Sequence, residues 1–347
     1  MIIKNQKIGI DEPPFIIAEM SGNHNQSLDR ALQMVTEAAN SGVDAIKLQT
    51  FTADTITLDV RYGDFLIDDE ESLWNGKNLY DLYKLAHTPW EWHAPIMERA
   101  QELGLICFST PFDESAVDFL ETLDVPAYKI ASFENIHLPL IKKVASTGKP
   151  ILLSTGMASL TELGEAVDVI NKAGCKDLVM LKCTSTYPAK PTSSNIMTIP
   201  NMKDVFNCQV GLSDHTLGIG VAIAAVAHGA TVIEKHFTLN RKDGGVDSAF
   251  SLEPSEFRSL VEETKRAWQS LGNISYGTSD AETNSKIFRR SLYISEDVKK
   301  GDVLTEKNLR CVRPGMGMPP KYIDILLGKR VNQDLRKGTP MNWGLIE

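Results

Sequence analysis

Short apolar runs recur along the chain, each bounded by turn-forming residues. A run of this length and composition is typical of a buried β-strand. Eight runs occur, at residues 15–20, 45–50, 105–110, 127–132, 151–155, 178–185, 210–215 and 232–237. Segments with the spacing of amphipathic helices lie between them, at residues 28–42, 91–104, 114–124, 159–174 and 218–230. The pattern therefore predicts strands that alternate with helices.

Eight strand–helix units in about 260 residues match the size and order of a (β/α)8 barrel, an α/β fold of the TIM type. A doubly wound open sheet is the main alternative. In a barrel, the carboxyl ends of all the strands open onto one face, and the active site lies there. Residues 256–272 are expected to form the eighth helix.

Composition changes after the eighth helix. Residues 273–287 are polar and are predicted to form a linker, whereas residues 288–347 read as short alternating strands with Gly and Pro turns. Two similar phrases, at residues 297–305 and 334–342, suggest internal near-symmetry in this small β-rich module. We therefore predict a catalytic barrel at 1–272, a linker at 273–287 and a small domain at 288–347.

Overall composition excludes several classes of protein. The formal net charge of -9 argues against a nucleic-acid partner, since nucleic-acid-binding domains usually present a basic face. Five cysteines without a close-spaced pair fit neither a disulfide framework nor a structural zinc site. No signal peptide or long apolar stretch is evident, so no membrane partner is expected and the cytoplasm is the predicted compartment.

Polar residues gather where the predicted strands end. Any one of them can be a capped strand end, but unpaired buried charge is costly, so a convergence from eight strands indicates a functional site. These residues are Glu19, Lys47, Gln49, Ser109, Thr110, Lys129, Ser132, Ser154, Lys182, Ser213, His215, Glu234 and His236.

Two histidines, His215 and His236, end the predicted seventh and eighth strands, which are neighbours in a barrel. They are candidates to share one metal ion, with Asp214 and Glu234 close by in sequence. Imidazole with water suits manganese, zinc or iron(II), so the residues alone do not select the metal. Such an ion would act as a Lewis acid on a substrate oxygen.

Two lysines, Lys47 and Lys129, lie inside otherwise apolar strands, where an unpaired ammonium is unfavourable. Three alternatives remain open. Each lysine pairs with a carboxylate such as Glu19 or Glu134, forms a Schiff base, or binds a phosphate or carboxylate ligand. In the last case hydroxyl donors would help, namely Ser132, Ser154 and Ser213.

At these positions the chain resembles the sialic acid synthase family of nonulosonate synthases. The matching segments occur in order, at residues 16–28, 44–51, 107–113, 127–135, 153–159, 181–188, 210–218 and 233–239. The end of the chain resembles the antifreeze-like (SAF) domain, with RSLY, KKGD and VRPGMG as markers. The resemblance implies a TIM barrel followed by a SAF domain.

Several details are similar to the pseudaminic acid synthase branch of that family. They are KIASFE, LKCTSTYP with Lys182, the segment at 71–93, and LGKRVNQD near the end of the chain. Spore-coat polysaccharide synthases share the KIAS and IEKHFT patterns. The alternatives are therefore another nonulosonate synthase, for N-acetylneuraminate, legionaminate or spore-coat polysaccharide. A non-catalytic carbohydrate-binding protein is the alternative from a different class.

The resemblance implies a metal-dependent condensation of phosphoenolpyruvate with the open-chain aldehyde of an N-acetylated amino sugar, with loss of phosphate. It implies His215 and His236 as ligands of manganese or magnesium. The expected phosphoenolpyruvate-binding residues are Lys47, Lys129, Ser132, Ser154 and Ser213. The expected catalytic carboxylates are Glu19, Glu134 and Glu234.

The sugar-binding residues implied by the resemblance come from both predicted domains. They are Gln49, Thr110, Phe112, Tyr187, Asp247 and Arg313. Arg313 matches an arginine that the tail of one subunit contributes to the barrel of its partner, so a domain-swapped homodimer is expected. The sugar implied by the pseudaminic branch is 2,4-diacetamido-2,4,6-trideoxy-L-altrose.

Overall fold

A computed structural model of the protein describes residues 1–70 and 72–347. Glu71, the first residue of the marker segment at 71–93, lies outside the described residues. The chain divides into two compact units, Met1–Gly272 and Asn273–Glu347, and each is described by itself below. None of the helices in the described residues is long and apolar enough to span a bilayer.

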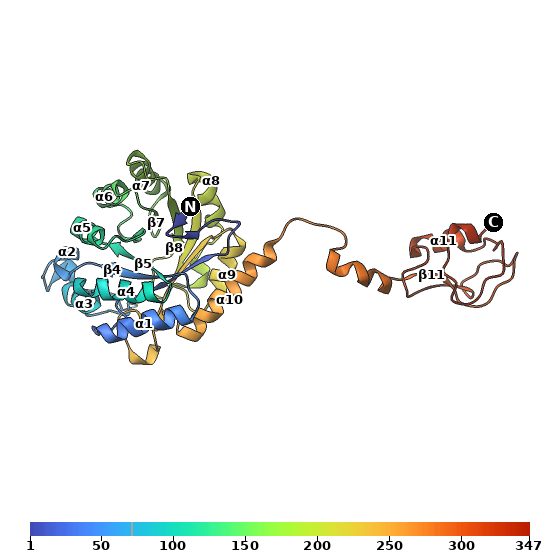
Figure 1. Ribbon diagram of the computed structural model, residues 1–347, viewed down its shortest axis with the longest axis horizontal. Helices are drawn as coiled ribbons and strands as arrows, with labels where there is room; N and C mark the ends of the chain where they lie inside the picture. Colours follow the sequence, from blue (N-terminus) through green and yellow to red (C-terminus); the bar gives the residue numbers. More distant parts are fainter. Residues whose placement is uncertain (71) are drawn as a thin grey trace. The chain divides into compact units, whose positions relative to one another are not determined.

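The first unit contains a closed barrel of eight parallel strands, in the order β10-β3-β4-β5-β6-β7-β8-β9 (Figure 1). The strands are β3 (Phe15–Glu19), β4 (Ala45–Thr50), β5 (Ile106–Pro111), β6 (Tyr128–Ile130), β7 (Ile151–Ser154), β8 (Leu178–Cys183), β9 (Gln209–Asp214) and β10 (Val232–His236). Each coincides with one of the eight predicted runs. The predicted TIM barrel is confirmed, and the open-sheet alternative is wrong.

Helices surround the barrel, as Figure 1 shows. The six predicted from spacing are present as α1 (Leu28–Asn40), α4 (His93–Glu102), α5 (Glu114–Thr122), α7 (Leu160–Lys172), α9 (Gly220–Ala227) and α10 (Pro254–Leu271). A capping box between Ser159 and Glu162 starts α7, because each side chain bonds a free backbone N–H of the first turn.

Among the described residues, the sequence analysis missed the short helix α11 (Ile323–Leu326) of the second unit and four helices of the barrel unit. Two complete the barrel, namely α6 (Leu138–Ser146) and α8 (Thr198–Phe206), and each has a proline close to its first residue. The other two, α2 (Ala53–Ile56) and α3 (Leu79–Ala86), lie in the long connection between β4 and β5. That connection therefore contains more structure than a simple crossover.

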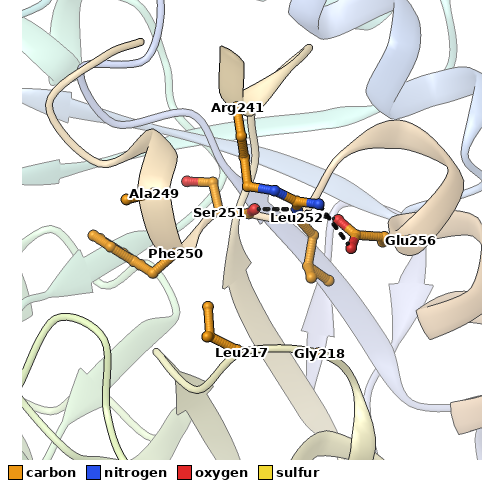
Figure 2. A pocket seen from close by; sticks show the side chains of 8 residues that line it. All are labelled: Leu217, Gly218, Arg241, Ala249, Phe250, Ser251, Leu252 and Glu256. Carbon is orange, nitrogen blue, oxygen red and sulfur yellow. Dashed lines mark hydrogen bonds and ion pairs between the residues drawn. The ribbon is translucent and has the colours of Figure 1, made fainter.

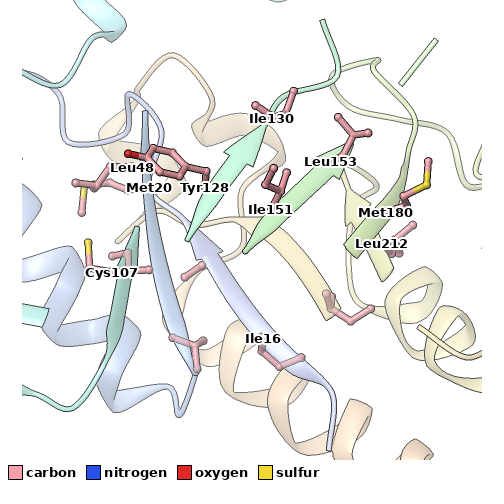
Figure 3. Packing of buried hydrophobic residues seen from close by; sticks show 14 of the residues in the cluster. Ile16, Met20, Leu48, Cys107, Tyr128, Ile130, Ile151, Leu153, Met180 and Leu212 are labelled. Carbon is pink, nitrogen blue, oxygen red and sulfur yellow. The ribbon is translucent and has the colours of Figure 1, made fainter. Parts of the chain in front are cut away.

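Side chains alternate strictly between the two faces of the barrel wall. Ile46 and Leu48 on β4 join the apolar layer between sheet and helices, whereas Ala45 lies in the barrel interior. Figure 3 shows part of the outer layer, including Ile16, Tyr128, Leu153, Met180 and Leu212. The alternation leaves Lys47, between Ile46 and Leu48, pointing into the barrel.

The amino-terminal hairpin closes one end of the barrel. Its strands are β1 (Ile2–Ile3) and β2 (Gln6–Lys7), which pair antiparallel. Ile3 and Ile8 join the interior cluster with Phe15 and Val232, the first residues of their strands. The amino-terminal end of the barrel is therefore filled with apolar side chains, and polar chemistry is confined to the carboxyl end.

The second unit contains a small antiparallel sheet of β11 (Ser291–Ile294) and β12 (Leu309–Val312) with its own apolar cluster. A 3₁₀ helix spans Asp280–Phe288, within and just beyond the predicted linker. The two similar phrases occupy equivalent places. Val298 and Leu335 exchange backbone hydrogen bonds of 2.9 Å, and Gly301 and Gly338 both have positive φ.

Candidate active site

Inward-facing polar side chains form a layer at the carboxyl end of the barrel. On most strands the first of them follows an apolar interior residue by two positions, such as Ile17 before Glu19 and Leu152 before Ser154. The structure therefore brings most of the predicted site residues together. The layer contains Glu19, Lys47, Gln49, Thr110, Lys129, Ser154, Ser213, Glu234 and His236, with His215 just beyond β9.

Glu234 lies between the two lysines. Its Oε2 is 3.8 Å from Lys47 Nζ and its Oε1 is 3.8 Å from Lys129 Nζ. Ser213 Oγ donates a 2.9 Å hydrogen bond to Oε1. Burial alone would raise the pKa of Glu234, but Lys129 and Lys47 outweigh it and lower that pKa. Glu234 is therefore a carboxylate that both lysines share.

Lys47 has the closer partners. Its ammonium contacts the Glu19 carboxylate directly and donates a 3.0 Å hydrogen bond to Thr110 Oγ1. Burial would lower the pKa of Lys47, but Glu19 and Glu234 outweigh it and raise that pKa. Gln49 Nε2 donates to the other oxygen of Glu19 at 2.9 Å. The ion-pair alternative is thus realised for Lys47 in this structure.

Lys129 is less well compensated. Its Nζ donates to Ser154 Oγ at 2.7 Å and to the backbone oxygen of Ile130 at 3.3 Å, and its nearest carboxylate partner is the shared Glu234. Burial lowers the pKa of Lys129 despite the opposing effect of Glu234. A buried ammonium with this incomplete compensation favours an anionic ligand.

Two serine hydroxyls lie in the loops after β6 and β8, the strands on either side of β7. Ser185 Oγ donates to Ser132 Oγ at 2.7 Å, which joins the loops after β8 and β6. Gly156, after β7, has positive φ and so little room that an added Cβ would collide with Ser132. The three loops therefore meet tightly around the Ser132 hydroxyl, beside the Lys129–Ser154 pair.

The two histidines are neighbours, with ring centroids 5.3 Å apart. His215 Nδ1 lies 2.9 Å from the backbone oxygen of Thr184 and donates to it, which leaves Nε2 as an acceptor. His236 Nδ1 is buried and has no hydrogen-bond partner among the described residues. Nε2 of the anchored His215 ring and the unpartnered Nδ1 of His236 are therefore suited to bind one metal ion.

No closed metal cage accompanies the pair. Among residues 1–70 and 72–347, no group of three or more His, Cys, Asp or Glu side chains is arranged to hold an ion. A metal bound by the two imidazoles would therefore keep positions for water or substrate, as catalytic sites do. The donor set fits a divalent ion but does not discriminate among ions.

Aromatic rings cover the histidines. The centroid of Tyr187 is 4.4 Å from that of His215, and Phe250 lies 4.9 Å from His236. Asp247 Oδ2 lies 3.6 Å from His236 Nδ1 and accepts a hydrogen bond from Ser21 Oγ. These side chains come from the loops after β3, β8 and β10, so they form one wall of the barrel mouth.

Glu134 lies on the loop after β6, away from that wall. Its Oε2 is buried without a hydrogen-bond partner among the described residues. Burial raises its pKa from the ordinary 4.5 to about 7, although Lys129 counteracts this. Phe112, at the end of β5, packs edge-on against Phe51 with centroids 5.1 Å apart. A carboxyl group with a spare acceptor is suited to binding a substrate hydroxyl.

Three of the expected residues face away from this site. Ser109, Lys182 and Asp214 occupy the outward positions of β5, β8 and β9, because each precedes or follows an inward-facing residue by one place. The expectation that Ser109 and Lys182 converge at the mouth was wrong, and Asp214, which was noted only as the neighbour of His215, also faces outward. Arg313 is exposed in the second unit. Its predicted contact with a partner's barrel stays a prediction.

The structure also adds residues that the sequence analysis did not select. Ser21 binds Asp247, and Ser185 binds Ser132. Trp74 contacts Tyr187, with ring centroids 5.8 Å apart. Ser21, Ser185 and Trp74 all lie within the segments that carry the family resemblance. That resemblance was the available signal, since neither spacing nor composition distinguishes them.

A separate pocket of about 280 Å³ borders the barrel mouth (Figure 2). Phe250 forms one wall, and Arg241 is held by Ser251 and Glu256 on another. Its lining consists of Leu217, Gly218, Arg241, Ala249, Phe250, Ser251, Leu252 and Glu256. The pocket includes none of the lysines or histidines described above, so it is distinct from the polar layer.

Two described family models match this chain. The NeuB family model matches residues 34–276, and the SAF domain model matches residues 289–347. The chain belongs to the NeuB family. The predicted family, and the SAF domain after the barrel, are therefore confirmed. The matched segment of this NeuB-family chain contains every predicted site residue except Glu19 and Arg313.

Relatives match nearly the whole length of this NeuB-family chain. A pseudaminic acid synthase from Campylobacter jejuni is 42% identical, over 96% of this chain and 97% of the relative. One from Helicobacter pylori is 41% identical, over 97% and 98% of the two chains. These relatives are named synthases, which confirms the prediction that the chain is a transferase-type enzyme.

A solved structure shares the fold. The N-acetylneuraminic acid synthetase from Leptospira borgpetersenii, determined in complex with citrate, has a TM-score of 0.73 and 33% sequence identity. The match covers 82% of this chain and 94% of that one. The NeuB-family chain therefore resembles synthases of different sugars, so its own sugar is a separate question.

Proposed function

We propose that this chain is a pseudaminic acid synthase. It condenses phosphoenolpyruvate with 2,4-diacetamido-2,4,6-trideoxy-L-altrose and releases phosphate. The observation that carries the reaction class is the incompletely compensated Lys129 beside Lys47 and two histidines. The support for this sugar is the 42% identity to the Campylobacter jejuni enzyme across almost the full length of both chains.

Phosphoenolpyruvate binds at the lysines in this proposal. Lys129 and Ser154 bind its phosphate, with Ser132 as a further hydroxyl donor. Lys47 and Ser213 bind the carboxylate end, and Lys47 exchanges part of its contact with Glu19 for the ligand. The ligand carries three negative charges, which compensate the positive charge of Lys129. Without the ligand, the nearest carboxylate to Lys129 is Glu234, which it shares with Lys47. Charge-assisted hydrogen bonds of this kind are stronger than neutral ones.

A divalent ion, manganese or magnesium, is held by His215 and His236 in this proposal. When bound, it supplies Lewis-acid polarisation of the sugar's aldehyde oxygen. The free Nε2 of His215 and the unpartnered nitrogen of His236 support this assignment. Asp247 Oδ2 lies 3.6 Å from the same nitrogen, so a carboxylate is close to the proposed ion and favours positive charge there.

The reaction forms one carbon–carbon bond and one carbon–oxygen bond to water, and it breaks the bond between carbon and the bridging oxygen. The methylene carbon of phosphoenolpyruvate attacks the aldehyde carbon, which leaves positive charge at the carbon that bears the phosphate. Water adds to that carbon and loses one proton, while the alkoxide formed from the aldehyde gains one. The new hydroxyl then loses its proton as the phosphate departs with the bridging oxygen, which leaves a keto group. Lys129 stabilises the charge that develops on the phosphate, and preorganised charge of this kind accounts for much of enzymatic rate enhancement.

Carboxylates surround the reacting atoms in this arrangement. Glu19, Glu134 and Glu234 are the candidates for proton transfer, and Glu134 has the spare acceptor and the pKa near 7 that suit this task. The sugar contacts Gln49, Thr110, Phe112, Tyr187 and Asp247. In a domain-swapped homodimer, Arg313 of one subunit contacts an acetamido group of the sugar that is bound in the barrel of the other subunit. The cytoplasmic location also stays a prediction.

A Schiff-base reaction is the second candidate, because burial lowers the pKa of Lys129 and a neutral amine is the nucleophile. Borohydride with pyruvate would trap such an adduct as a covalent mass increase on Lys129. We expect none. Other nonulosonate synthases remain the alternatives for the substrate, and a non-catalytic carbohydrate-binding protein is the alternative for the class.

One experiment tests the reaction itself. Phosphoenolpyruvate labelled with ¹⁸O at the bridging oxygen is incubated with enzyme, manganese and the diacetamido sugar, and phosphate and product are analysed by mass spectrometry. The proposal predicts label in the phosphate, and a product mass equal to both substrates plus water minus phosphoric acid. Label retained in the sugar product would contradict it, as would phosphate release that does not depend on the sugar.

A further inference from the structure

Residues 57–70 and 72–78, between α2 and α3, form an arm that folds back on itself. Ile67 N donates to Lys77 O at 2.9 Å, and Gly76 N donates to Ile67 O at 2.7 Å. Asn78 closes the base of the arm, since it binds the backbone of Val60 and Phe65 and also caps α3. Trp74 lies near the tip, so the arm holds this side chain away from its base.

The arm reaches loops on the opposite side of the barrel. Trp74 follows β4 in the chain, yet its indole contacts Tyr187 in the loop after β8, with centroids 5.8 Å apart. In the closed order of strands, β4 and β8 are four places apart, which is the largest separation that eight strands allow. A side chain that joins the two must therefore extend over the mouth of the barrel.

The indole is anchored between two residues of the proposed sugar site. Its Nε1–H donates a 2.9 Å hydrogen bond to the backbone oxygen of Val246, the residue before Asp247. Tyr187 in turn contacts His215 with a tilted ring, and the two ring centroids are 4.4 Å apart. Trp74 is therefore linked to His215 through Tyr187, and to Asp247 through the adjacent Val246.

We propose that Trp74 is a specificity-determining residue that contacts an apolar substituent of the sugar, either its 6-deoxy methyl or an acetamido methyl. Its single donor is already used by Val246, so the remaining ring surface is apolar. A hydroxyl against that surface would lose water without gaining a partner, which is unfavourable. The substrate class is therefore a deoxygenated, N-acylated sugar. This inference rests on the proposed function.

Steady-state kinetics of Trp74 variants test the proposal, with phosphate release as the readout. Trp74→Ala should raise the KM for the diacetamido sugar about 10-fold or more, which is ~1.4 kcal/mol, with the phosphoenolpyruvate KM within about 2-fold of wild type. Trp74→Phe keeps a ring but not the donor and should lie between. Leu73→Ala is the matched control, since the neighbouring Leu73 is 45% exposed and lies in the same arm.

Two sugar analogues sharpen the test, one with a hydroxyl in place of the 6-deoxy hydrogen and one with a hydroxyl in place of the 4-acetamido group. Wild type should favour the diacetamido sugar over both by kcat/KM, and Trp74→Ala should reduce at least one preference about 10-fold. Unchanged preferences would overturn the proposal, as would equal increases in both substrates' KM. If Trp74→Ala fails to fold, the same comparison with Trp74→Phe and Trp74→Leu decides.

Failure of the proposed function gives a different result. If wild type uses another N-acetylated sugar in place of the diacetamido sugar, the assigned substrate is wrong. The Trp74 variants are then compared on that other sugar and its analogue lacking the N-acetyl group. A Trp74→Ala enzyme that discriminates between those two as wild type does would overturn the inference separately.

Discussion

Lys235 Nζ lies 2.7 Å from Asp214 Oδ2, and the two side chains form an ion pair that is almost entirely buried. They are register partners on β10 and β9. Because side chains alternate along a strand, this pair faces the helix layer, while the following residues, His236 and His215, face the mouth. The Lys235 ammonium also binds Thr216 O at 2.7 Å, so it ties together the strand ends that bear both histidines.

Removal of one partner should destabilise the protein strongly. Lys235→Met leaves Asp214 as a buried charge without its partner, which costs about 3–5 kcal/mol in other proteins. We expect a loss of that order in the free energy of unfolding, measured by urea denaturation. The Asp214→Asn/Lys235→Met double variant should recover part of it.

An exposed ion pair provides the control for this prediction. Lys172 pairs with Asp168 on the surface of α7, and both side chains are mostly exposed. Lys172→Met should therefore change the free energy of unfolding by less than about 1 kcal/mol. Equal effects of Lys172→Met and Lys235→Met would show that the buried pair has no special importance.

Glu134 should make stability depend on pH. Its pKa is raised by burial from 4.5 to about 7, so the folded state binds a proton more tightly than the unfolded state does. The stability from this proton is fully present below about pH 4.5 and is lost as pH rises through 7. Glu134→Gln, which cannot ionise, should therefore stabilise the protein at pH 8 by at most about 3 kcal/mol and have little effect at pH 4.

Thermal unfolding of wild type and Glu134→Gln at several pH values measures this difference. The matched control is Glu165→Gln, because Glu165 is an exposed carboxyl group on α7. A difference between wild type and Glu134→Gln that is the same at pH 4 and pH 8 would mean that Glu134 ionises normally in the folded state.

Substitution of Ser154 should weaken the binding of phosphoenolpyruvate and leave the binding of the sugar unchanged. Ser154→Ala removes the hydroxyl that accepts from Lys129 at 2.7 Å. A hydrogen bond to a charged group contributes about 1.5–3 kcal/mol, so the phosphoenolpyruvate KM should rise about 10-fold or more. Initial rates at varied phosphoenolpyruvate and saturating sugar measure this. Ser146→Ala, which removes a surface hydroxyl on α6, is the control. An unchanged KM in Ser154→Ala would remove Ser154 from the anion site.

Metal removal should abolish turnover. EDTA-treated protein should lose phosphate release and regain it with manganese, and His215→Ala and His236→Ala should each bind manganese at least 10-fold more weakly. Electron paramagnetic resonance counts free manganese directly, so binding is measured apart from activity. His228→Ala, at the end of α9, is the control. Full activity of the stripped protein would contradict the metal assignment.

Sequence reasoning located the barrel and most of its polar layer for one physical reason. In β4, for example, Ile46 and Leu48 on either side of Lys47 face the helices. Because side chains alternate along a strand, Lys47 must then face the barrel interior. The same rule, applied to Asp214 and Lys182, would have placed them outside the barrel. Helix α6 could also have been predicted, because Pro139 lies in its first turn, where proline is tolerated, and its buried Leu140, Ile141, Val144 and Ala145 have helical spacing.

Contacts between distant segments could not be predicted. Trp74 and Tyr187 are joined only by the fold of the arm after β4, which no local pattern encodes. The pairing of Ser21 with Asp247 has the same origin, since those residues lie at opposite ends of the barrel sequence. The predicted role of Arg313 involves a second chain, so no local pattern could have established it.

The most direct measurement of the central claim is a competition between sugars. Enzyme, manganese and limiting phosphoenolpyruvate are incubated with equal concentrations of 2,4-diacetamido-2,4,6-trideoxy-L-altrose, its 6-deoxy diacetamido mannose analogue and N-acetylmannosamine, and the nine-carbon products are quantified by mass spectrometry and chromatography. The account predicts that the altrose-derived product, pseudaminic acid, predominates. Predominance of either other product would contradict it.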